Sequence, residues 1–155
     1  MLTFPLRVPV GRCRWTIAEA GQSIVETALV LPILVFALIG AADLARGYAT
    51  LLAVQNGARA GAESYVLQRF PSASQAQTQA IAEINRTPGV NVTTANVTVT
   101  PDRNADGSPC TPPTTLTAPC YVTVRVVYTF RTLIAWPLIP STATFDRRTT
   151  MRQFN

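Results

Sequence analysis

Residues 21–42 read GQSIVETALVLPILVFALIGAA, and this stretch decides the architecture of the chain. From Ile24 onward its only charged residue is Glu26, and Asp43 follows directly after it. In a helix, residues 24–42 rise about 1.5 Å each, or roughly 28 Å in all, which matches the hydrocarbon thickness of a bilayer. The stretch therefore predicts a membrane-spanning helix that carries one carboxylate.

That carboxylate needs an explanation, because a charged side chain at the bilayer centre costs about 2.5–3.5 kcal/mol on insertion scales. In one interpretation, Glu26 lies near the start of the span and snorkels to water. In the other, the chain is cut after Gly21, so that Gln22 becomes the new N-terminus. Glu26 then lies in the first helical turn, where the helix dipole favours it, and neutralises the terminal amine of a neighbouring subunit. The chemistry of these residues leaves both interpretations open.

Residues 1–21 form a leader whose basic residues are Arg7, Arg12 and Arg14. Positive charge before the span predicts a cytoplasmic N-terminus and an extracytoplasmic location for everything after Asp43. A secretory signal peptide is the alternative, but its apolar core would be shorter, about 7–15 residues. We therefore expect a leader over 1–21 and a transmembrane helix over 22–42.

Residues 43–66 continue as an amphipathic helix. Apolar residues recur at three- and four-residue spacing: Leu44, Tyr48, Leu51, Leu52, Ala58, Ala62 and Tyr65. A second row is small at every fourth position: Ala41, Ala45, Ala49, Ala53, Gly57 and Gly61. Such a row lets another backbone approach closely, as in small-xxx-small motifs, or it simply reflects the helix propensity of alanine.

Residues 67–155 read as a β-rich extracytoplasmic region with one further helix. The sequence Phe70-Pro71-Ser72 breaks the first helix, and Ser72 or Ser74 can cap a second over 73–86. Residues 90–94 and 95–99 alternate in opposite parity, which predicts a strand with a bulge. The clearest strand is 121–131, and its buried face is Val122, Val124, Val126, Tyr128 and Phe130.

An apolar turn over 133–140, which includes Trp136-Pro137, precedes the last predicted strand, 142–153. The buried face of that strand is predicted to hold Ala143, Phe145 and Met151. A long helix, a short helix and then strands predict an α+β fold, in which a small antiparallel sheet packs on the long helix.

The three cysteines divide by location, because Cys13 lies in the leader while Cys110 and Cys120 flank a loop rich in proline and threonine. In an oxidising compartment the loop pair would form a disulfide worth about 2–3 kcal/mol on the chain-entropy model. The alternative is two free thiols in the cytosol. We favour the disulfide because the predicted anchor exports this region.

Composition argues against several functions. The chain is 48% hydrophobic and only 14% charged, which fits a membrane segment. Its net charge of +5 comes from scattered arginines rather than a clustered patch, so we expect no nucleic acid partner. Histidine is absent, and no paired-carboxylate cleft, catalytic triad or metal-ligand spacing is evident. We expect no enzyme activity, no cofactor and no metal.

One motif resembles a metal site. Residues Asp102–Gly107 read DRNADG, which matches the opening of an EF-hand calcium loop. The twelfth loop position is Pro113, where a bidentate glutamate is needed. A polar turn rich in Asp, Asn and Gly is therefore the preferred interpretation, with calcium binding as the alternative.

The helical segment as a whole resembles the TadE-like family of pilin-like proteins. The sequence pattern of that family resembles G-Q-x-x-V-E-x-A-L-V-L-P, followed by an apolar run, then D-x-x-R, and then Q-N-x-A-R-x-G-A. The matching residues here include Gly21, Gln22, Glu26, Pro32, Asp43, Arg46, Gln55, Asn56, Arg59 and Gly61. The position after Glu26 is often Phe in the family and is Thr27 here.

This resemblance implies a pilin-like fold and a minor pilin or pseudopilin of a tight-adherence (Tad) pilus. A prepilin peptidase would cut between Gly21 and Gln22, and Glu26 would act in assembly. The implied partners are that peptidase, other pilin-like subunits, the Tad secretion machinery and the bacterial inner membrane. The implied location is a single-pass inner-membrane protein with a periplasmic C-terminal region, or a subunit of the extracellular pilus. The alternative is an unpolymerised, membrane-anchored extracytoplasmic binding module.

Overall fold

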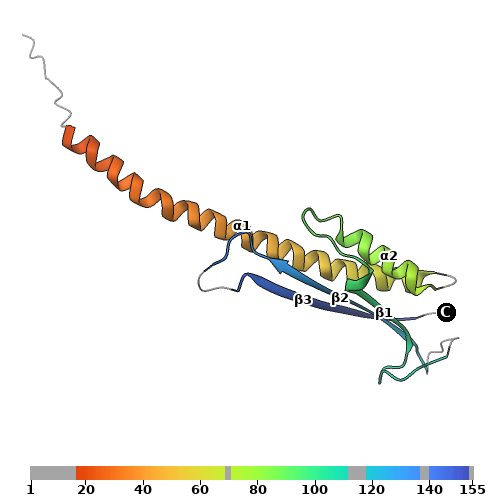
Figure 1. Cartoon of the computed structure of the whole chain (residues 1–155). Coiled ribbons are helices and arrows are strands. Elements are labelled where there is room, and N and C mark those ends of the chain that lie inside the picture. The colour runs from red at the N-terminus through yellow and green to blue at the C-terminus, as the bar shows by residue number, and fades with distance from the viewer. Residues whose placement is uncertain (1–16, 69–70, 112–117, 137–139, 154–155) are drawn as a thin grey trace, which may run out of the picture. The chain divides into compact units, whose positions relative to one another are not determined.

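The computed structural model describes residues 17–68, 71–111, 118–136 and 140–153, with side chains from Gly21 onward. Its elements are α1 (Ile17–Leu67), α2 (Ala73–Ile84), the 3-10 turn η1 (Thr94–Asn96), β1 (Val97–Arg103), β2 (Tyr121–Arg131) and β3 (Thr142–Arg152) (Figure 1). The α+β prediction is confirmed. Several residues of the sequence predictions lie outside the described ranges: Arg7, Arg12, Cys13, Arg14, Phe70, Pro113 and Pro137.

Chain contacts divide the protein into two units, residues 1–41 and 42–155. In the first unit α1 is continuous, although Pro32 lies inside it. Proline has no N–H, so the Ala28 carbonyl lacks its usual helical donor. Described side chains before Ala42 are mostly exposed, including Ile24, Leu29, Ile33 and Leu38 at 68–71%. From Gly21 onward α1 contains a stretch that is long and apolar enough to cross a membrane, with a mean hydropathy of 2.4.

In the second unit, α2 lies alongside the C-terminal part of α1 (Figure 1). The approach is close because Gly57 and Gly61 have no side chain between the helices. A Cβ built on either residue would lie 3.0 Å from a carbonyl oxygen of α2, that of Ala80 or Ala76 respectively. At Gly57 and Gly61 the small-residue row therefore packs against the chain's own second helix, and Ala53 is buried as well, whereas Ala41, Ala45 and Ala49 stay exposed.

The sheet is antiparallel in the order β1-β2-β3, so β2 is central. Val122, Val124 and Val126 of β2 are fully buried, and they share one core with Val54, Ala58 and Tyr65 of α1. The predicted limits of β2 agree with the structure, and Phe130 is buried as predicted while Tyr128 is half-buried. The opposite face of the sheet carries polar pairs, such as Arg125 with Asp146.

The strand predicted over 90–94 is wrong, and so is the bulge near Thr94. Residues 90–93 are irregular, and η1 accounts for the change of parity before β1 begins at Val97. The cause is Asn85, whose side chain accepts a hydrogen bond from Val92 N (2.8 Å) and donates one to Val92 O (3.1 Å). A side chain therefore satisfies the backbone groups that a strand neighbour would otherwise pair. The bond also places Asn85 at the end of α2, which stops at Ile84 rather than at Arg86.

Two other burial predictions need correction. Ala143 is opposite Phe130 on the inner face of the sheet but is exposed, because β3 is an edge strand. Leu44 and Tyr48 are 75% and 63% exposed. They lie on a different side of α1 from the buried residues Asp43, Thr50 and Val54, which recur at seven- and four-residue spacing. The predicted apolar face of α1 therefore combined an inward row with an outward row.

Candidate functional site

The predicted processing and assembly residues all lie in the exposed first half of α1. Gly21, Gln22 and Glu26 are exposed helical residues, and a Cβ built on Gly21 would meet no other atom within 4 Å. Within the described ranges Glu26 has no ion-pair or side-chain hydrogen-bond partner, and its neighbour Thr27 bonds only back to Ser23 O. Any partner of Glu26 must therefore come from outside these residues.

Asp43 is the reverse case, because the rest of the chain surrounds it. Its carboxylate is 5% exposed. It accepts hydrogen bonds from Leu133 N at 3.0 and 3.1 Å, one to each oxygen, and from Trp136 Nε1 at 3.3 Å. Arg46 contributes an ion pair at 3.2 Å. Asp43 thus joins α1 to the connection between β2 and β3. It directly follows the apolar residues 24–42.

These donors lower the pKa of Asp43, and the Leu133 backbone N–H is the largest cause. Burial opposes the shift, while Trp136, the Ile134 backbone and Arg46 add to it in that order. The carboxylate is therefore held in its charged form by hydrogen bonds more than by its ion pair. In structural terms, Asp43 clamps the β2–β3 hairpin to α1.

Arg46 takes part in this clamp and in a second contact. Its guanidinium carbon lies 5.5 Å from the centroid of the Phe130 ring, within the range of a cation–π interaction. Phe130 in turn stacks on Phe145 of β3, with ring centroids 6.1 Å apart. Asp43 therefore contacts the residues that follow β2, and Arg46 contacts Phe130 near the end of that strand.

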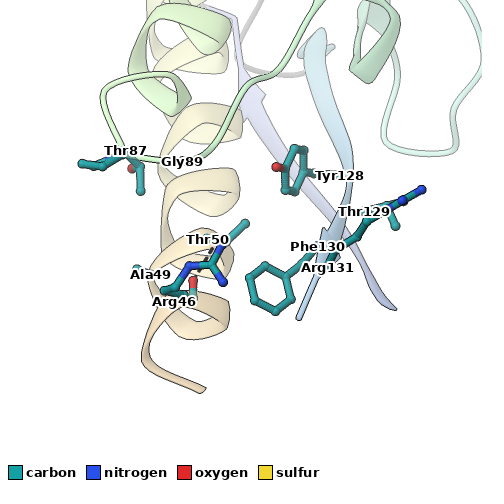
Figure 2. A pocket seen from close by; sticks show the side chains of 10 residues that line it. Arg46, Ala49, Thr50, Thr87, Gly89, Tyr128, Thr129, Phe130 and Arg131 are labelled. Atoms are coloured by element: carbon teal, nitrogen blue, oxygen red, sulfur yellow. Dashed lines mark hydrogen bonds between the residues drawn. The ribbon is translucent and has the colours of Figure 1, made fainter. Parts of the chain in front are cut away.

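A cavity of about 430 Å³ opens next to this contact, and Figure 2 shows the Phe130 ring turned toward α1 across it. Its lining residues come from α1, the loop after α2, and β2: Arg46, Ala49, Thr50, Thr87, Pro88, Gly89, Tyr128, Thr129, Phe130 and Arg131. Among the described residues, hydroxyl groups and arginines line it, but no carboxylate, cysteine or histidine does. The lining offers positive charge and hydrogen bonds rather than an acid–base pair.

The remaining motif residues lie further along α1. Gln55 and Asn56 are exposed, and no described residue hydrogen-bonds to either side chain. Arg59 forms an exposed ion pair with Glu63, four residues later, at 2.7 Å. Gly61 instead faces inward, against Ala80 and Val124. The motif therefore combines an inward packing residue, Gly61, with the outward polar residues Gln55 and Asn56, which have no side-chain hydrogen bond among the described residues.

Comparison with known proteins finds one similarity, which lies within α1. Residues 21–63 match the TadE-like protein family. Among curated proteins and solved structures, none matches the chain. The TadE-like segment runs from the predicted cleavage position to the ion pair at Glu63, and it includes every motif residue on α1. The match covers residues 21–63 alone, so it concerns this part of α1 and not α2 or the sheet.

The features outside the TadE-like segment have structural roles. Cys110 and Cys120 form a disulfide that links the segment after β1 to the start of β2. In the Asp102–Gly107 turn, the Asp106 carboxylate accepts hydrogen bonds from the backbone and hydroxyl of Ser108, and these lower the pKa of Asp106. Gly107 adopts a φ of 86°. Among described residues, no cluster of three acidic, histidine or cysteine side chains could hold a metal.

Sequence reasoning missed the partners of Asp43. Leu133 and Trp136 are 90 and 93 residues away from it, and no local pattern predicts such a pairing. One signal was present, because the turn between the last two strands is apolar where polar residues are usual. An apolar turn that contains an indole donor fits a position against a buried acceptor.

Proposed function

We propose that this chain is a minor pilin or pseudopilin of a tight-adherence pilus. In this proposal a prepilin peptidase cleaves after Gly21, residues 22–42 anchor the mature protein in the bacterial inner membrane, and the sheet and α2 lie in the periplasm. Other pilin-like subunits then contact α1 during assembly. The chain acts as a structural subunit, without a catalytic step of its own.

One observation carries the proposal: the apolar residues 24–42 of the TadE-like segment are mostly exposed, and their single acid, Glu26, has no partner among the described residues. Lipid can cover the apolar side chains, but the hydrocarbon region of the bilayer offers no partner for a carboxylate. The amine created at Gln22 in a neighbouring subunit has the required charge. A subunit that must find its partner in another copy or in a related pilin fits this chemistry.

The outward side of α1 supports the same proposal. Leu44, Tyr48 and Leu52 recur at four-residue spacing and are 75%, 63% and 40% exposed. Gln55 and Asn56 follow on the exposed part of the helix. An outward row of this kind suits packing against another helix as well as the membrane interface.

Amino-terminal sequencing of protein extracted from membranes tests the cleavage. With a prepilin peptidase present we expect a start at Gln22, and a start at Met1 contradicts the proposal. Gly21→Leu should leave the leader attached, because the peptidase must accommodate the residue before the cut. Gly21→Leu leaves the fold unchanged, since no atom lies within 4 Å of a Cβ at this position. Correct processing without any incorporation into filaments would instead favour an unpolymerised binding module.

A further inference from the structure

The β2–β3 hairpin ends in an apolar tip, Leu133–Trp136. Leu133 is 64% exposed, Ile134 is 38% exposed, and Ala135 is exposed as well. Connections between strands at a water-facing surface are usually rich in Gly, Pro, Asn, Asp and Ser. The composition of this tip is therefore typical of a surface that contacts apolar groups rather than water.

The polar groups of the tip point inward. Leu133 N donates to both carboxylate oxygens of Asp43, and Trp136 Nε1 donates to one of them. Thr132 Oγ1 donates to Ile134 O at 2.8 Å, and Thr132 N donates to Ser141 O at 3.0 Å. The tip thus satisfies much of its own hydrogen bonding while its aliphatic side chains face outward. An apolar environment favours this arrangement, because unpaired backbone groups are strongly unfavourable there.

Asp43 determines the depth of the tip relative to a membrane. It directly follows the apolar residues 24–42, so a span over those residues leaves Asp43 at the level of the lipid headgroups. The tip is hydrogen-bonded to Asp43 and shares that level. Tryptophan is enriched at this depth, since its ring is apolar and its N–H polar. Arg46, one turn later, is 44% exposed and offers a cation to headgroup phosphates.

We propose that the tip Leu133–Trp136 inserts among the lipid headgroups of the leaflet in which the α1 span ends. This rests on the proposed membrane anchoring by α1. The extracytoplasmic unit then has two membrane contacts, the helix itself and the hairpin tip, and the Asp43 clamp keeps them together. Extraction of the subunit during assembly has to withdraw both contacts.

Site-specific fluorescence in the full chain tests this inference. In a Cys13→Ser background, Ala135→Cys carries the environment-sensitive dye NBD, since Cys110 and Cys120 are bonded to each other. The protein is reconstituted in vesicles of phosphatidylethanolamine and phosphatidylglycerol that contain a headgroup-proximal nitroxide lipid. The matched control is Thr98→Cys, an exposed position of β1. We expect a blue-shifted spectrum and at least twofold stronger quenching at Ala135 than at Thr98.

Leu133→Glu provides the second arm. The side chain of Leu133 is exposed, so the substitution leaves the fold intact while it places a charge in the tip. The Ala135 label should then resemble the Thr98 label, although the protein still floats with vesicles. Equal, water-like spectra at Ala135 and Thr98 before this change overturn the inference.

Two further outcomes separate the proposals. Protein that fails to float with vesicles overturns the anchoring and the tip insertion together, whereas floating protein with a water-exposed Ala135 label overturns the tip insertion alone. A blue shift without quenching by the nitroxide lipid means that protein covers the tip, and this also overturns the inference. Quenching that Leu133→Glu abolishes supports it.

Discussion

Glu26 and Asp43 are two carboxylates of one helix in opposite surroundings. Glu26 is exposed and has no partner in the described residues, whereas Asp43 is 5% exposed and accepts hydrogen bonds from Leu133 and Trp136. Glu26 lies within the apolar residues 24–42, and Asp43 directly follows them. A charge without a partner is unfavourable in such a stretch. The difference shows that the chain itself supplies hydrogen-bond donors to the carboxylate at Asp43, whereas the described residues supply none to the carboxylate at Glu26.

The apolar side chains of the two units show the same contrast. Leu29, Ile33 and Leu38 are exposed in the first unit, while Val54, Ala58 and Ala62 are fully buried in the second. The first stretch is apolar almost throughout, whereas the second is amphipathic and has small residues at several of its buried positions. The first stretch exposes large residues that no described part of the chain covers, and Gly57 and Gly61 of the second admit α2.

The largest expected effect comes from Glu26→Ala. If the partner of Glu26 is the terminal amine of another subunit, its removal should lower the amount of protein recovered in sheared filaments at least tenfold. Membrane insertion and the melting temperature of the detergent-solubilised protein should not change, because no described residue contacts this carboxylate. Thr27→Ala is the matched control, since Thr27 bonds only within its own helix turn. Wild-type filament yield from Glu26→Ala would refute the amine pairing.

Gly57→Ala and Gly61→Ala test the part of α1 that packs against α2. A Cβ at position 57 would overlap Ile84 Cγ1, and one at position 61 would lie 3.0 Å from both Ala76 O and Ala80 Cβ. Overpacking of this kind destabilises by about 1–3 kcal/mol. Urea unfolding of the detergent-solubilised chain measures it, followed by a probe in β2. Unchanged midpoints would mean that α2 does not pack closely on α1 in solution.

Asp43→Asn tests the clamp, with an effect of several degrees in melting temperature at neutral pH. The hydrogen bonds lower the folded pKa of Asp43 below its unfolded value of about 3.9. The stabilisation is therefore fully present above that value and is lost as the pH falls through the lowered folded pKa. The difference in melting temperature between wild type and variant should be constant above about pH 5 and should shrink below pH 4.

Arg46→Gln is the control for the same site. Arg46 is the smallest cause of the lowered pKa, so this variant should lose less stability than Asp43→Asn and should keep the acid-dependent step. A larger loss from Arg46→Gln would assign the clamp to the ion pair and the Phe130 contact instead of the hydrogen bonds.

The predictions from sequence succeeded where the environment follows a local period. Residues 121–131 alternate except at Val127, and β2 has the predicted limits. They failed where a distant or side-chain partner replaces the local pattern. Residues 90–94 alternate too, but Asn85 binds the backbone of Val92. Asp43 was found as a motif residue, yet its role depends on Leu133, which is 90 residues away. Periodicity in the sequence predicts whether a residue is buried or exposed, but it does not predict which distant residue will form a hydrogen bond with it.

Gly47→Ala has the smallest expected effect and refines the comparison at the boundary between the units. A Cβ at position 47 would lie 3.5 Å from Phe130 Cε1, an ordinary contact. Replacing a helical glycine by alanine should then stabilise by about 0.5–1 kcal/mol. Urea unfolding beside Gly57→Ala measures the sign, and a loss of stability would contradict the packing at Phe130. If the variant gains stability but forms fewer filaments, a neighbouring subunit packs closely against α1 at Gly47. The part of α1 that needs an outside partner then extends past Asp43.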